Sequence, residues 1–281
     1  MRIAVASGKG GTGKTTVSSN LAYYLSKKGR DISLIDCDVE EPNNHIFFQP
    51  DWYASLKVTL PVPEVDIKSC SSCGKCSDFC QFGAIICIRG KVLVFPELCH
   101  GCGGCAKICP QTAIKETTRE IGEIQLGMKD SLHFIQGVMR IGEAMSPPLI
   151  NEVKACVKQG DIIIDCPPGT SCPMIQAVKD SDFVLLVTEP TPFGLHDLKL
   201  AVATVRQLNL PFAVGLNRST IGDERVKEYC KDENIEIILE IPEDREIAQA
   251  YSQGKIFLES SPHYEEHFAA LFKKMEEIAL C

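Results

Sequence analysis

A glycine-rich loop near the N-terminus lies between a short apolar strand and an amphipathic helix. Residues 2–7 are mostly apolar, residues 8–15 read GKGGTGKT, and Val17, Leu21 and Leu25 follow at helical spacing. A strand that enters a helix through a G-x-x-x-x-G-K-S/T loop is typical of a phosphate-binding loop. Glycines let successive backbone N–H groups face phosphate oxygens, and the helix N-terminus adds partial positive charge. We therefore expect an α/β fold with this loop at the carboxyl end of a parallel sheet.

The loop also predicts which side chains contact a nucleotide. Lys14 is expected to bridge the β- and γ-phosphates of ATP, and the Thr15 hydroxyl is expected to ligate Mg²⁺. The residues expected to surround the phosphates are Gly8, Gly10, Gly11, Thr12, Gly13, Lys14, Thr15 and Thr16.

Further apolar runs extend this beginning into a sheet. Residues 32–35 form a second strand that ends in Asp36-Cys37-Asp38, so the first 38 residues are expected to be a βαβ unit. After a long interruption, a helix is expected at residues 149–157 and a last one at 264–280. The predicted fold class is α/β, a parallel sheet flanked by helices with a small α+β insert. The later strands are expected at residues 162–165, 183–187, 212–216 and 235–239.

A second lysine in the loop indicates one class of phosphate-binding proteins. The form K-G-G-x-G-K-T-T, which begins at Lys9, resembles the deviant Walker motif of the superfamily of MinD, ParA and the nitrogenase iron protein. The resemblance implies a P-loop ATPase in which Lys9 reaches the phosphates bound by a partner subunit. It therefore also implies a homodimer that forms on ATP binding.

Four further segments carry the same resemblance, which covers about residues 1–50 and 116–281. The segment Asp36-Cys37-Asp38 is similar to the family's first switch, which implies that Asp38 orients the attacking water. The sequence DCPPG at 165–169 resembles the second switch, which implies that Asp165 binds Mg²⁺, often through water. The segments after the last two strands resemble the adenine-binding elements, which implies contacts from Asn217, Pro242 and Asp244.

The chain has 15 cysteines, and nine of them lie between residues 61 and 114. Two runs with the spacing C-x-x-C-x-x-C-x-x-x-C, at 70–80 and 99–109, repeat at an offset of 29 residues. This spacing matches bacterial two-cluster ferredoxins, in which the fourth cysteine of each run serves the other cluster. The match implies one 4Fe-4S cluster on Cys70, Cys73, Cys76 and Cys109, and a second on Cys99, Cys102, Cys105 and Cys80.

Other interpretations of the cysteines stay open. Gln81 stands where proline normally follows the fourth cysteine, which affects the local turn but no ligand. Structural zinc also uses C-x-x-C pairs, but it closes with four ligands and does not need the third cysteine of each run. Cys172 lies seven residues after Asp165, a spacing similar to that of the cysteine with which the nitrogenase iron protein binds a cluster between subunits. A bridging cluster at Cys172 is therefore a further alternative.

The cysteine-rich segment is expected to be an inserted domain. The α/β alternation stops at Pro61-Val-Pro63, and residues 61–114 carry five basic and four acidic side chains. We therefore expect an ATPase domain of residues 1–60 and 115–281 and an inserted two-cluster domain of residues 61–114. So small a segment has little apolar core, so its clusters are expected to be needed for folding.

Charge and hydropathy exclude several classes of partner. The chain carries 29 basic and 37 acidic residues, a net charge of -8, so neither nucleic acid nor an anionic membrane surface is expected to bind it. No apolar run approaches the roughly 20 residues that span a bilayer. The first residues contain no secretion signal, so we expect a cytoplasmic protein whose thiols stay reduced.

The combination of motifs favours an ATPase that acts in iron-sulfur or metal-cluster assembly and delivery. Its expected partner is a protein acceptor of electrons or clusters. Two alternatives stay open. One is an ATP-gated electron donor to a partner metalloenzyme, which resembles the nitrogenase iron protein, and the other is a spatial organiser like MinD or ParA.

Overall fold

The computed structural model describes residues 1–157 and 159–280, and it divides them into two compact units. Unit 1 consists of Met1–Ser55, Ile124–Val138 and the described residues from Ile150 onward, and unit 2 consists of Leu56–Glu123 and Met139–Leu149. The expected insert, residues 61–114, lies within unit 2, which also contains residues on both sides of it.

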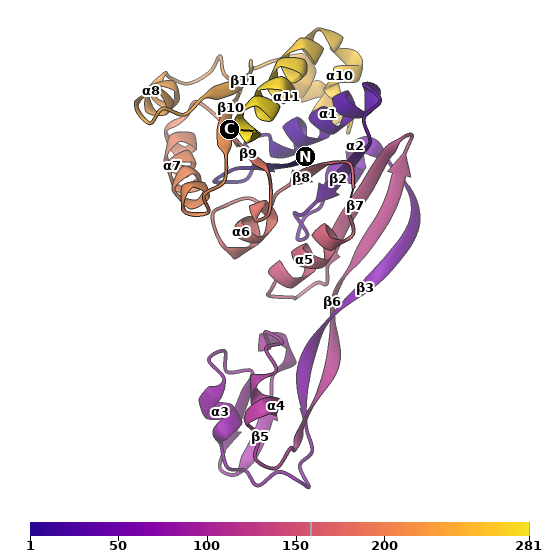
Figure 1. Cartoon of the computed structure of the whole chain (residues 1–281), viewed down its shortest axis with the longest axis vertical. Coiled ribbons are helices and arrows are strands. Elements are labelled where there is room, and N and C mark those ends of the chain that lie inside the picture. The colour runs from indigo at the N-terminus through magenta and orange to yellow at the C-terminus, as the bar shows by residue number, and fades with distance from the viewer. Residues whose placement is uncertain (158, 281) are drawn as a thin grey trace. The chain divides into compact units, whose positions relative to one another are not determined.

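Strands and helices alternate along most of unit 1, as Figure 1 shows. The strands of the chain are β1 (Arg2–Ala6), β2 (Ile32–Asp36), β3 (Asp51–Val65), β4 (Ile85–Ile88), β5 (Lys91–Val94), β6 (Ile114–Lys129), β7 (Leu132–Met139), β8 (Asp161–Asp165), β9 (Phe183–Thr188), β10 (Phe212–Asn217) and β11 (Ile237–Ile241). The α-helices are α1 (Lys14–Lys27), α2 (Asn44–Phe48), α3 (Lys75–Phe79), α4 (Gly104–Ile108), α5 (Pro147–Ala155), α6 (Cys172–Val178), α7 (Pro192–Gln207), α8 (Arg225–Asp232), α9 (Arg245–Ser252), α10 (Phe257–Ser260) and α11 (Glu265–Ala279), with short 3-10 turns at Pro96–Leu98 and Pro262–Tyr264.

Nine of the described strands form one sheet, in the order β11-β10-β9-β1-β8-β2-β7-β6-β3. Every neighbouring pair from β11 to β7 is parallel, so the carboxyl ends of these strands lie along one edge. The structure thus confirms the expected α/β fold with a large, mostly parallel sheet flanked by helices.

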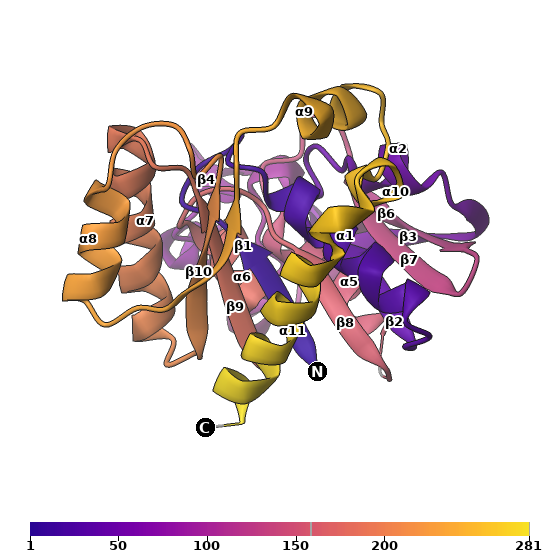
Figure 2. The ribbon, with the colours of Figure 1, turned by 90° about the horizontal axis from the view of Figure 1, so that it is seen from above.

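One apolar core of the sheet lies where α1 and α11 cover it. Figure 2 shows these two helices together on one face of the sheet, while α6 and α7 contact β1 and β9. The core cluster joins side chains of both helices to alternate residues of the strands, which is the pattern of a half-buried strand face. Its members include Ile3, Val17, Leu21, Leu25, Ile163, Leu185, Phe268, Leu271 and Met275. None of the helices that the structure describes has the length and apolar content needed to cross a bilayer.

Unit 2 shows the internal repeat in its backbone. Helices α3 and α4 begin 29 residues apart and contact each other, and Figure 1 shows them beside β5. The Asp66 N–H donates to the Ala113 carbonyl at 2.8 Å, and the equivalent Phe95 N–H donates to the Ala84 carbonyl at 2.7 Å. Strands β4 and β5 pair antiparallel as a hairpin between the two halves. The two halves of the repeat therefore share one local structure.

Two expectations about secondary structure were wrong. The strand expected at 235–239 begins only at Ile237, because the Ile235 N–H still closes the turn after α8 on the Cys230 carbonyl at 2.8 Å. The expected break at Pro61-Val-Pro63 is no break, since β3 runs through both prolines. Strand β3 is the last strand in the order of the sheet and so lies at its edge. A proline is tolerated in an edge strand, because its missing N–H can face away from the neighbouring strand.

A buried ion pair fastens residues 139–149 to β6 within unit 2. The Arg119 guanidinium contacts both carboxylate oxygens of Glu143, and the Glu143 side chain is fully buried. We predict that Arg119→Ala destabilises unit 2 by about 3–5 kcal/mol, because it leaves a buried carboxylate without its cation. Hydrogen exchange of the amides at 139–149 measures this loss of protection. Lys57→Ala, which removes only the exposed pair with Glu120, is the control and should change little.

Candidate functional site

The glycine-rich loop connects β1 to α1 and borders a cavity of about 440 Å³ in unit 1. Gly13, just before α1, has a φ of 96°, a conformation that glycine adopts without strain. A Cβ at this position would also lie 2.3 Å from Nδ2 of Asn217, so the glycine is needed for space as well. The expected phosphate-binding residues that line the cavity are Gly10, Gly11, Gly13, Lys14, Thr15 and Thr16.

The other three expected loop residues do not line this cavity. Thr12 is buried, and its carbonyl oxygen accepts a hydrogen bond from the side-chain amide of Asn217 at 3.0 Å. Gly8 packs so closely on α7 that a Cβ at this position would lie 2.1 Å from the Asp197 carbonyl oxygen. Lys9 is half-buried. It precedes the lining residue Gly10 in the sequence but does not line the cavity itself.

The expected adenine-binding residues form another part of the same cavity wall. Asn217 lies at the end of β10, and Pro242 and Asp244 follow β11. Asp244 uses one oxygen to cap α9 through the Glu246 N–H at 2.7 Å and the other to accept from the Tyr264 hydroxyl at 2.8 Å. The hydrogen bond from Tyr264 is the main reason why the pKa of Asp244 is lowered. The carboxylate therefore holds this wall in place.

Three carboxylates meet at the carboxyl ends of β2 and β8. Asp36 and Asp165 are register partners and are nearly inaccessible to solvent, whereas Asp38 is half-buried and lines the cavity. Burial and then the charge of Asp165 raise the pKa of Asp36 to about 7 and that of Asp38 to about 6. Burial also raises the pKa of Asp165, against the opposing charge of Lys14. A cation is the group that would stabilise all three charges.

The chemistry of this cluster fits a hydrated Mg²⁺. Oδ1 of Asp165 is buried and has no hydrogen-bond partner among the residues that the structure describes. Mg²⁺ prefers one or two carboxylates together with water and phosphate oxygens. Asp165, the Thr15 hydroxyl and a phosphate of the nucleotide would supply such ligands.

Several cavity residues were missed by the sequence analysis or left out of the expected site. Arg218 pairs with Glu189 at 3.0 Å and Glu243 at 3.2 Å, and its position directly after Asn217 was the only available sign. Asn44 does not line the cavity but contacts Asp36 and Asp165 behind it, and it follows a loop with no periodic pattern that could have marked it. The other missed residues that line the cavity are Glu41, Asn43, Pro168, Ile247, Ala248 and Tyr251.

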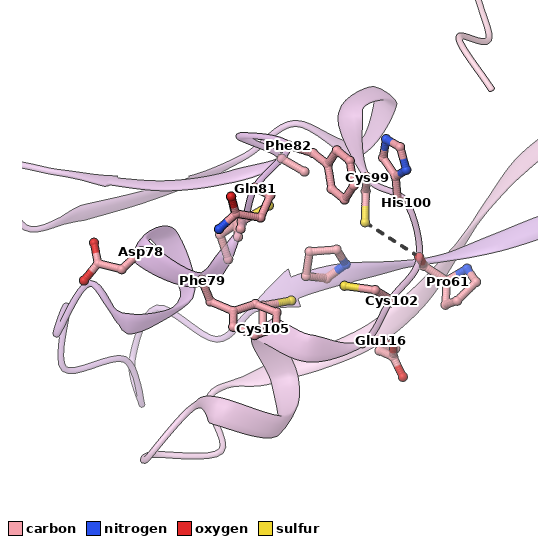
Figure 3. Close-up of a pocket in the computed structure, with 15 residues that line it drawn as sticks. Pro61, Asp78, Phe79, Gln81, Phe82, Cys99, His100, Cys102, Cys105 and Glu116 are labelled. Atoms are coloured by element: carbon pink, nitrogen blue, oxygen red, sulfur yellow. Dashed lines mark hydrogen bonds between the residues drawn. The ribbon is translucent and has the colours of Figure 1, made fainter. Parts of the chain in front are cut away.

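The eight expected cluster ligands gather in unit 2 as two groups of four, each around its own cavity. A cavity of about 410 Å³ is lined by Cys80, Cys99, Cys102 and Cys105, and Figure 3 shows three of them beside the stacked Phe82 and His100. A smaller one, of about 20 Å³, is lined by Cys70, Cys73, Cys76 and Cys109. Each group takes its fourth cysteine from the other run, which is the crossed arrangement expected from the spacing.

Backbone N–H groups approach the sulfurs in the same way in both halves. The N–H of Ser72 contacts Sγ of Cys70 and that of Gly101 contacts Sγ of Cys99, both at 3.4 Å. A backbone hydrogen bond from Lys75 is the largest cause of the lowered pKa of Cys73. Such donors stabilise thiolates, so the donor set and its surroundings fit iron-sulfur clusters.

The alternative metal sites are zinc at the cysteine runs and a bridging cluster at Cys172. Within residues 1–157 and 159–280, no three His, Cys, Asp or Glu side chains converge closely enough to hold a single metal ion. Cys172 is exposed at the first position of α6, and Cys37 and Cys166 are buried at the ends of β2 and β8.

Comparisons with known proteins agree with this architecture. The profile of the CobQ/CobB/MinD/ParA nucleotide binding domain matches residues 3–257. An uncharacterized protein of Methanocaldococcus jannaschii is 34% identical over 92% of this chain and 91% of its own length. The iron-sulfur cluster carrier protein of Aquifex aeolicus is 24% identical over 98% of this chain and 67% of its own length. Among solved structures, the septum site-determining protein MinD of Pyrococcus horikoshii, complexed with Mg-ADP, is similar with a TM-score of 0.62 and 20% identity over 99% of this chain and 96% of that one.

Lys14 is the cationic residue of the loop that lines the cavity, so we predict that Lys14→Ala weakens MgATP binding by roughly 10- to 150-fold. This corresponds to the loss of a charge-assisted hydrogen bond of about 1.5–3 kcal/mol. Fluorescence titration with a labelled ATP analogue measures the change. Lys28→Ala, at the other end of α1, is the control, and unchanged affinity in the Lys14 variant would refute the assignment of the loop.

Proposed function

The chain belongs to the CobQ/CobB/MinD/ParA nucleotide-binding family, and from this we propose that it is an ATPase acting in the assembly or delivery of iron-sulfur or other metal clusters. One observation carries the proposal: the cavity beside the phosphate loop and two crossed groups of four cysteines occur in the same chain. The iron-sulfur cluster carrier protein of Aquifex aeolicus, a distant relative, supports it.

In this proposal, residues 61–114 form an inserted ferredoxin-like domain with two 4Fe-4S clusters. Cys70, Cys73, Cys76 and Cys109 would hold one cluster, and Cys80, Cys99, Cys102 and Cys105 the other. The clusters would store iron for a protein acceptor or pass electrons to it. The apolar core of this domain includes Cys76 and Cys105 themselves, so we also propose that cluster binding stabilises the fold.

The nucleotide site would work through a few side chains of unit 1. Lys14 and the loop N–H groups would hold the phosphates of ATP, and Thr15 and Asp165 would hold Mg²⁺, which neutralises charge on the phosphates. Asp38, half-buried on the cavity wall, would orient the attacking water. Lys9, which does not line the cavity of its own chain, would reach the phosphates of a second copy in an ATP-dependent homodimer.

A second candidate function is ATP-gated electron donation to a metalloenzyme. It is favoured by the two adjacent cysteine groups within one small unit, which share the core cluster around Ile85 and Ile114. Such a pair suits the transfer of electrons between clusters. The two candidates differ in what leaves the protein, since a carrier loses iron and an electron donor keeps it.

Iron accounting tests the proposed function. We predict that anaerobically purified protein with bound ⁵⁷Fe transfers iron to an apo-ferredoxin, and that MgATP changes the rate. Mössbauer spectroscopy of the separated proteins measures the transfer. Lys14→Ala, at an MgATP concentration that saturates only the wild type, is the control that carries iron but shows no ATP effect. Iron that stays fully on this chain while the acceptor is reduced would favour electron donation instead.

The crossed arrangement of the cysteines predicts which cluster each substitution damages. Cys80→Ser should impair the cluster on Cys99, Cys102 and Cys105, and Cys109→Ser the cluster on Cys70, Cys73 and Cys76. Iron content and electron paramagnetic resonance of each variant measure the loss. If each substitution instead damaged the cluster of its own run, the proposed ligand sets would be incorrect.

Variants of Asp38 and Lys9 should show separate effects on ATP binding, ATP hydrolysis and dimerisation. Asp38→Ala is predicted to bind ATP, to hydrolyse it at least roughly 100-fold more slowly because the water loses its orienting base, and to accumulate as a dimer. Lys9→Ala is predicted to bind ATP as a monomer. Phosphate release and light scattering with ATP measure both effects, and a normal dimer of the Lys9 variant would contradict its role.

A further inference from the structure

Asn44, the first residue of α2, joins two carboxylates from different strands. Its side chain is fully buried, and its Nδ2 group donates to Oδ2 of Asp36 at 3.1 Å and to Oδ2 of Asp165 at 2.6 Å. Asp36 ends β2 and Asp165 ends β8, and the two are register partners on neighbouring strands. One amide group therefore holds together the ends of two strands of the sheet.

An asparagine suits this position for a chemical reason. Ionised carboxylates only accept hydrogen bonds, so two of them side by side need a donor with two hydrogens. The amide supplies both hydrogens without adding a charge. A serine could donate to only one of the two carboxylates, and an alanine to neither.

Two buried oxygens at this contact are Oδ1 of Asn44 itself and Oδ1 of Asp165. Neither has a hydrogen-bond partner among the residues that the structure describes. Buried polar atoms in folded proteins nearly always have a hydrogen-bond partner or a ligand. A hydrated cation would serve both atoms, because Mg²⁺ usually keeps several of its waters. The two oxygens therefore indicate that the amide belongs to the surroundings of the metal.

The backbone around Asn44 continues this connection along the chain. The N–H groups of Asn43 and Asn44 also donate to Oδ2 of Asp36, at 3.0 and 3.1 Å. Helix α2 ends at Phe48, and β3 begins at Asp51 and passes from unit 1 into unit 2 at Ser55. The same short segment thus contacts the metal-side carboxylates and leads into the strand that enters unit 2.

We propose that Asn44 is a positioning residue that orients Asp165 toward Mg²⁺ and links that carboxylate to the segment entering β3. The inference rests on the proposed function, in which Asp165 serves Mg²⁺. It goes further by proposing that α2 responds to nucleotide binding, and by assigning a role to a residue that does not itself line the nucleotide cavity.

The first test is the Mg²⁺ dependence of binding of a fluorescent ATP analogue. Asn44→Ala should lower the affinity for Mg²⁺ by 10- to 100-fold, as expected when a partner of a metal ligand is lost. The affinity for the analogue without Mg²⁺ should stay unchanged. Asn44→Ser, which keeps one donor and is a milder change, should give an intermediate loss. Wild-type Mg²⁺ dependence in both variants would overturn the proposal.

A matched control separates this role from general destabilisation. Asn20 is also a buried asparagine, which donates to the Thr16 carbonyl at 2.8 Å and accepts from the Leu258 N–H at 3.0 Å. Asn20→Ala should lower the melting temperature and leave the Mg²⁺ dependence unchanged. An equal loss of Mg²⁺ affinity in this control would assign the effect to stability and overturn the role of Asn44.

The second test is hydrogen exchange at residues 44–55 with and without Mg-ADP. The wild type should gain protection there on binding, and Asn44→Ser should bind Mg-ADP at saturating concentration without that gain. Equal protection in both proteins would contradict the link to β3. A wild-type chain that binds no nucleotide at all would refute the proposed function itself, which distinguishes that failure from a failure of the inference alone.

Discussion

Two carboxylates buried side by side at the ends of β2 and β8 are the constraint on which the nucleotide site of unit 1 depends. Asp36 and Asp165 face each other in register and are almost inaccessible to solvent. Like charges at such a position are costly unless donors and cations compensate them. The neighbouring amide of Asn44 and the charge of Lys14 do so in part. Oδ1 of Asp165, which has no partner among the described residues, would be a ligand for Mg²⁺. Binding of a metal nucleotide would therefore complete the electrostatics of the strand ends.

A different constraint holds unit 2 together. It is built from two similar halves, and two small core clusters within it combine cysteines with aliphatic residues such as Ile85, Ile114 and Val62. So little apolar burial stabilises a domain of this size only weakly. If the cysteines bind clusters, the binding energy adds to the folding energy. The proposed cargo or electron carrier would then also be a structural element, so that loss of clusters would loosen the unit.

The sequence predicted the parts whose chemistry depends on local spacing. Turn residues and short periodic runs predict the phosphate loop and the strands β1, β2 and β8 to β10, and the structure has them where they were expected. The grouping of the eight cysteines is implied by the resemblance of their two runs to bacterial two-cluster ferredoxins. The extended strands β3 and β6 were not predicted, because Pro61 and Pro63 interrupt one pattern and the polar residues 116–120 interrupt the other. Asn44 could not be predicted either, since its role comes from two carboxylates 8 and 121 residues away in the chain.

The proposed function requires that nucleotide binding in unit 1 affects the cysteine groups of unit 2. The most direct measurement is electron paramagnetic resonance of the anaerobically purified, chemically reduced protein, recorded with and without MgATP and repeated on Lys14→Ala. We expect the signals of two interacting reduced 4Fe-4S clusters and a change in their shape or relaxation when MgATP is added. The variant should show no change at an MgATP concentration that saturates only the wild type. A spectrum that MgATP leaves unaltered, in protein shown to bind it, would contradict the claim.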